Sequence, residues 1–163
     1  MIKRNEVTDL LVGLIEQLGI RCGAHVAPNN VGWDEGEPNK GAFIPYCVVK
    51  TNVTRTERKP LRTETWDWSL AYQMTVWSPD PATTDDLIGL IGERFLRFGR
   101  CAVSGFVLDY VQVEQVSGLS ANKQFNPYLW QATLSLTVYA MRSREPFTGS
   151  MQKQTPDLVT TRR

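Results

Sequence analysis

The stretch that decides the fold is "WDWSLAYQMTVWSPDP", residues 66–81, in which large apolar and small polar side chains alternate until the prolines end the pattern. A period of two places alternate side chains on opposite faces of a β-strand. One predicted face carries Trp66, Trp68, Leu70, Tyr72, Met74 and Val76. Because burying each such side chain is worth roughly 1.5–3 kcal/mol, we expect this face to be core.

The other predicted face of this strand has no lysine or arginine; its members are Asp67, Ser69, Ala71, Gln73, Thr75 and Trp77. A second stretch, "LWQATLSLTVYAM" at 129–141, alternates in the same way and contains no charged residue. Sheet faces in contact with water usually carry charges that discourage pairing with other chains. We therefore expect these strands to be covered by neighbouring subunits, or alternatively by loops of the same chain.

Two amphipathic helices are predicted from apolar residues spaced three and four apart. The first carries Val7, Leu10, Leu11, Leu14, Ile15 and Leu18, with Gly19 as its stop. The second lies in "SPDPATTDDLIGLIGERFLRFG", residues 78–99, with Thr83 or Thr84 as the N-cap. Its apolar stripe contains Leu87, Ile88, Ile91, Phe95 and Leu96.

Further strands are predicted at 46–54 and 106–116, with a short one within 19–27, while 28–44 and 117–128 read as loops rich in turn residues. This order predicts an α+β fold: a mostly antiparallel sheet of four to five strands, two helices packed on one face, and long loops. Residues 1–142 are expected to form one domain. Residues 143–163 lack periodicity and are expected to be a C-terminal tail or arm.

Composition restricts the possible functions. The 163 residues include 18 basic and 17 acidic ones, so a formal charge of +1 gives no overall attraction to nucleic acid or to a membrane. The cysteines, Cys22, Cys47 and Cys101, are far apart and His25 is the only histidine, which indicates neither a disulfide framework nor a zinc site. The start of the chain does not resemble a signal peptide or membrane span, so synthesis in the cytoplasm is expected.

No catalytic or cofactor-binding residue is predicted. Asp34, Glu35 and Glu37 could hold calcium, but they lack the spacing of an EF-hand loop, so a solvated loop is the better interpretation. An enzyme would have to assemble its site from scattered carboxylates such as Asp34, Glu35 and Asp109, and their spacing gives this no support. We expect no enzyme activity, cofactor or metal.

The arrangement of elements resembles the tail terminator (tail completion) proteins of long-tailed bacteriophages. The resemblance rests on the N-terminal amphipathic helix, "PYCVV" (45–49), the charged hairpin after it, "VWSPDPATTDDLIGLIGERF" (76–95) and "LWQATLSLTVYA" (129–140). It implies a virion protein that forms a hexameric ring on the tail tube, ends tube polymerisation and meets the head-tail connector. DNA would pass through the lumen without being read, and no catalytic residue or cofactor is implied.

The charged segment 55–64 is expected to dock the partners of such a ring, the tail tube protein and the head-tail connector protein. The candidate interface residues are Arg55, Glu57, Arg58, Lys59, Arg62 and Glu64. Two alternatives stay open. The chain could be another ring protein of the neck, such as a connector or stopper, or a small nucleic-acid-binding module that uses the basic residues of 55–62.

Overall fold

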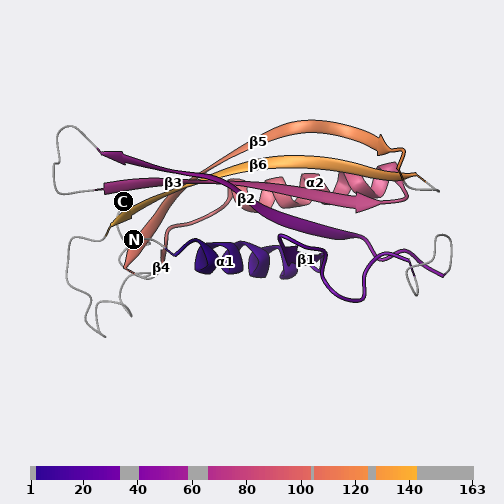
Figure 1. Ribbon diagram of the computed structural model, residues 1–163, viewed down its shortest axis with the longest axis horizontal. Helices are drawn as coiled ribbons and strands as arrows, with labels where there is room; N and C mark the ends of the chain where they lie inside the picture. Colours follow the sequence, from indigo (N-terminus) through magenta and orange to yellow (C-terminus); the bar gives the residue numbers. More distant parts are fainter. Residues whose placement is uncertain (1–2, 34–40, 59–65, 104, 125–127, 143–163) are drawn as a thin grey trace.

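A computed structural model describes residues 3–33, 41–58, 66–103, 105–124 and 128–142 of the chain. In this described part of the chain, two helices and six strands form the fold (Figure 1). In chain order they are α1 (Arg4–Glu16), β1 (Arg21–Ala24), β2 (Tyr46–Arg58), β3 (Trp66–Ser78), α2 (Pro81–Leu96), β4 (Cys101–Val103), β5 (Phe106–Asn122) and β6 (Leu129–Arg142).

All six strands belong to one curled sheet with the order β1-β2-β3-β6-β5-β4. The pair β1 and β2 is parallel, and the other four neighbouring pairs are antiparallel. The predicted α+β class with two helices is therefore confirmed. The expected count of four to five strands was too low, because a three-residue strand such as β4 leaves little periodic signal in a sequence, whereas β1 lies within the short strand predicted at 19–27.

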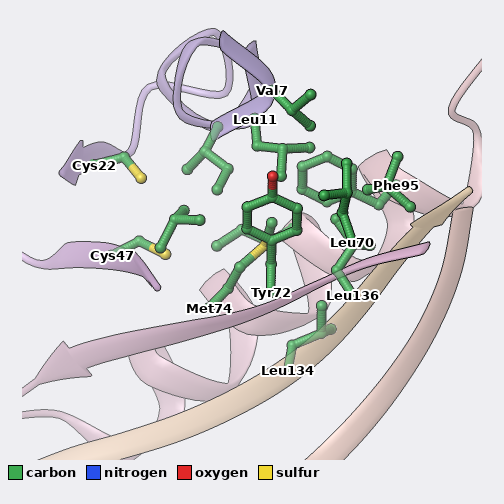
Figure 2. Packing of buried hydrophobic residues seen from close by; sticks show 14 of the residues in the cluster. Val7, Leu11, Cys22, Cys47, Leu70, Tyr72, Met74, Phe95, Leu134 and Leu136 are labelled. Atoms are coloured by element: carbon green, nitrogen blue, oxygen red, sulfur yellow. The ribbon is translucent and has the colours of Figure 1, made fainter. Parts of the chain in front are cut away.

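Both helices pack on the same face of the sheet. Helix α1 contacts β1 and β2, while α2 contacts β3, β5 and β6. Between the helices and the sheet lies one hydrophobic core, in which Val7, Leu11 and Ile15 of α1 meet the apolar residues of the strands (Figure 2). Gly19, with φ at 81°, follows the turn that ends α1, as the sequence predicts.

Tyr72 shows how tightly α1 is held on the sheet. Its ring is completely buried and its hydroxyl points toward α1, where it donates a 3.5 Å hydrogen bond to the carbonyl oxygen of Arg4 (Figure 2). Burial raises the pKa of Tyr72, because the phenolate form would lose hydration. The neutral hydroxyl therefore serves as a fixed donor to the first turn of α1.

Helix α2 begins one turn earlier than predicted. Its N-cap is Asp80, whose carboxylate accepts hydrogen bonds from the N–H of Thr83 at 3.1 Å and from the Thr83 hydroxyl at 2.6 Å. Pro81 occupies the first turn, where a missing N–H costs nothing. The prediction of Thr83 or Thr84 as the N-cap was therefore wrong. Thr84 is fully buried and donates to the carbonyl of Asp80 at 3.1 Å.

Strand β5 is longer than predicted. It continues through 117–122, which the turn residues of "SGLSAN" had marked as loop, because β6 pairs with it as far as Asn122 opposite Leu129. Register shifts at Gln115/Ser117 and Ser117/Ser120 accommodate the irregular segment. The predicted C-terminal tail, 143–163, lies outside the described residues.

Candidate assembly surface

The face of β3 and β6 opposite the helices is the open face of the molecule. It is formed by Ser69, Ala71, Gln73, Thr75 and Trp77 of β3 together with Gln131, Thr133, Ser135, Thr137 and Tyr139 of β6. None of these ten side chains is charged, and Asp67, opposite Met141, is the next position of β3 on this side of the sheet. Within the described residues, no helix lies on this face (Figure 1).

Pairs of polar side chains hydrogen bond across the strands of the open face. The hydroxyls of Thr75 and Thr133 lie 3.1 Å apart, and the indole N–H of Trp77 donates to the side-chain oxygen of Gln131 at 3.1 Å. These polar groups already have hydrogen-bond partners within the sheet. Another protein could therefore cover the face and leave few of the polar groups without a hydrogen bond. These ten positions thus form an uncharged surface that is suited to burial against another protein.

Four aromatic rings gather at one end of the open face. Tyr46 and Trp77 stack with ring centroids 5.4 Å apart, Phe43 stacks on Tyr46 at 6.2 Å, and Trp33 meets Phe43 edge to face at 5.1 Å. An isolated bridge between Gly32 and Ile44 brings Trp33 and Phe43 together across the base of the predicted long loop. We call these four residues the aromatic row.

Sequence reasoning did not find the aromatic row. Trp33 and Phe43 fall in a predicted loop, and the sequence pattern places Trp77 on the uncharged face without a partner for its ring. The available signal was the presence of Trp33, Phe43 and Tyr46 within fourteen positions. Such spacing does not show which rings meet, since that depends on the bridge between Gly32 and Ile44.

Charged side chains border the open face on the flanking strands. Lys50 of β2 and Glu114 of β5 are exposed. Their register partners, Gln73 and Ser135, are neighbours at the centre of the open face. Lys50 therefore places a positive charge at the β2 border of the open face, and Glu114 a negative charge at its β5 border.

The predicted docking residues fall in and beyond the far end of β2. Arg55, Glu57 and Arg58 belong to the strand, and the first two stand opposite Ser69 and Asp67 of β3. Their side chains lie outside the described residues, as do Lys59, Arg62 and Glu64 altogether. The register places positions 55 and 57 on the open-face side of β2, next to the β3 residues of that face.

Two of the three cysteines lie next to each other in the sheet. Cys22 and Cys47 are register partners on β1 and β2 and are both buried, although 25 positions separate them in the sequence. Their mutual hydrogen bond and their burial raise the pKa of the Cys47 thiol, and burial raises that of Cys101. Protonated thiols are weak nucleophiles at neutral pH.

Metal ligands do not gather in the described part of the chain, where no group of three or more His, Cys, Asp or Glu side chains could hold an ion. Asp34, Glu35 and Glu37 lie outside that part, and of Asp109 only the backbone is described. Neither described helix is long and apolar enough to cross a membrane.

No protein-family model matches the chain, and no curated protein is significantly similar to it.

Proposed function

We propose that this protein is a structural virion protein whose copies form a hexameric ring on the tail tube of a long-tailed bacteriophage. The observation that carries the proposal is the open face of β3 and β6, which combines ten uncharged side chains with a position opposite both helices. A face of this kind is stabilised by burial against other subunits.

The proposed ring acts through binding contacts and catalyses no reaction. Each copy would contact a copy on either side through two different surfaces, a heterologous contact that closes into a ring when the rotation fits. One side of the ring would bind the tail tube protein and end its polymerisation, and the other would bind the head-tail connector protein. DNA would pass through the lumen without specific recognition.

The far end of the β2–β3 hairpin supports the docking part of the proposal. The two strands pair as far as Arg58 and Trp66, and the segment between them is rich in charge. Charges of both signs favour orientation and rapid encounter between partners over non-specific sticking. We therefore assign tube or connector docking to Arg55, Glu57, Arg58, Lys59, Arg62 and Glu64.

The competing function is a small nucleic-acid-binding module that uses the basic residues of segment 55–62. A single-strand platform needs exposed rings beside cationic groups. In the aromatic row, the rings of Phe43, Tyr46 and Trp77 stack on one another, which uses ring faces that bases would need. This arrangement favours the assembly function.

The test is the native mass of the purified protein over a range of concentrations and salt, with an oligonucleotide added in a parallel series. We expect a discrete six-subunit species that ignores the oligonucleotide. A monomer that binds the oligonucleotide, with affinity falling steeply as salt rises, would instead establish the nucleic-acid module. Addition of tail tube protein to the six-subunit species then tests whether the ring stops tube growth.

A further inference from the structure

Both outer long strands of the sheet are only partly covered at their edges. Strand β1 pairs with Tyr46–Val49 of β2, and β4 pairs with Phe106–Leu108 of β5. Within the described chain, no other strand pairs with the outer edge of β2 at 50–58 or with that of β5 at 109–122. An uncovered edge presents backbone N–H and C=O groups that another strand can pair with.

The two outer edges carry opposite charge. Segment 50–58 contains Lys50, Arg55 and Arg58 against Glu57, a net charge of +2. Segment 109–122 contains two acidic residues, Asp109 and Glu114, and no basic one, a net charge of −2. Pairing the β2 edges of two copies, or their β5 edges, would bring like charges together. Pairing β2 of one copy with β5 of another joins opposite charges.

The register of the sheet aligns these edges residue by residue. Lys50 is opposite Gln73, Gln73 is opposite Ser135, and Ser135 is opposite Glu114, so Lys50 and Glu114 end one row that crosses four strands. A second row runs from Arg55 through Ser69 and Tyr139 to Tyr110, which follows Asp109. A copy that extends the sheet without a shift would place Lys50 beside Glu114 and Arg55 beside Tyr110.

Strand direction allows this extension. Strands β2, β3, β6 and β5 alternate in direction, so a neighbour with the same orientation sets its β2 antiparallel to β5. Val111 and Val113 of β5 are half-buried at the rim of the core. They lie in the rows of Thr54 and Thr51, so the neighbour's strand would cover them.

We propose that the outer edge of β2 in one copy pairs antiparallel with the outer edge of β5 in the next copy, with residues 50–55 along residues 110–114 and Lys50 opposite Glu114. The contact joins different edges of identical chains, so each copy keeps one edge for each of its two neighbours. The inference rests on the proposed function, because it specifies one contact between subunits of the ring, at the sheet edges, in addition to the burial of the open face.

The experiment measures self-association of the full chain by sedimentation velocity for wild type, Lys50→Glu, Glu114→Lys and the double variant. We expect each single reversal to weaken association at least about tenfold, because it sets like charges against each other, and the double variant to restore it. Glu16→Lys, an equal change of charge on the exposed side of α1, is the matched control and should associate like wild type. Hydrogen exchange should show amides of 50–55 and 110–114 protected on association.

The outcomes separate this contact from the proposed ring. A six-subunit species unaffected by either reversal, or a double variant as impaired as the single ones, would overturn the edge pairing and leave the ring function standing. Association that follows the charges but yields another number of subunits would support the edge pairing and overturn the hexamer. A wild-type chain that stays monomeric at every concentration would overturn the pairing.

Discussion

Strands β3 and β6 present two faces that differ in almost every respect. On the helix-covered face, Leu70, Tyr72, Met74 and Val76 are 0–1% exposed and belong to the core. On the open face, one residue away in each case, Ser69, Ala71, Gln73 and Thr75 are small or polar and half-buried. The first face determines whether the chain folds, and we expect the second to determine what the folded chain joins.

The strongest test of this difference is to shorten two adjacent side chains of β6, one on each face. Leu136 is fully buried on the covered face, and Leu136→Ala should lower the free energy of unfolding by about 2–5 kcal/mol through lost burial and a cavity. Ser135→Ala, one position earlier on the open face, should change it by less than about 0.5 kcal/mol. Urea denaturation measures both, and equal losses would show that the open face is core.

A charge placed on the open face tests its role in assembly. Ala71→Lys puts a cation between β2 and Thr137 at the centre of this face. Burying an unpaired charge against another subunit is costly, so self-association should weaken by about tenfold or more while the chain stays folded. Gln17→Lys, exposed after α1, adds the same charge elsewhere and is the control. Native mass spectrometry would contradict the role if both variants assembled like wild type.

Two glycines of α2 test how closely this helix packs on the covered face. Gly89 is exposed with open space around its Cα, so Gly89→Ala should stabilise the chain by about 0.5–1 kcal/mol through helix propensity. At Gly92, an added Cβ would lie 3.2 Å from Cδ1 of Leu134, so Gly92→Ala should gain less or lose stability. Equal gains in urea denaturation would show that α2 packs more loosely on β6 than these contacts indicate.

The smallest expected effect concerns the start of α2. Hydrogen bonds from Thr83 lower the pKa of Asp80 in the folded chain. The ionised carboxylate therefore stabilises the fold above the ordinary aspartate pKa. This stabilisation is lost as the pH falls through the lowered pKa of the folded chain. Asp80→Ala should lower Tm by a few degrees at neutral pH and by less in acid. Thermal melts along a pH series check this, and a difference that does not vary with pH would contradict it.

The sequence predicted the features that depend on local periodicity. The alternation around Tyr72 and Leu136 identified both faces of β3 and β6, and the spacing of Val7, Leu11 and Ile15 identified α1. Features that depend on pairing between distant segments were missed. These are β4, the extension of β5 past Gln115, the aromatic row, and the adjacency of Cys22 and Cys47.

The misses have a common physical cause. Serine and glycine at 117–120 favour turns by themselves, but the ladder to β6 holds them extended, as tertiary context often does for strands. The sequence did not single out Asp80, because Asp80, Thr83 and Thr84 are all good N-cap residues. The choice among them depends on where β3 ends. The docking residues at 55–64 stay a prediction.

The central position of the β3–β6 pair has a consequence for the timing of synthesis. The hairpin of β2 and β3 is complete by Ser78, but its central partner begins only at Leu129, so a growing chain must add fifty residues before β6 can join it. Pairing over such a separation is slow, because a long loop must close first. Half of the open face is contributed by β6, so an unfinished chain on the ribosome cannot present the complete surface to another copy.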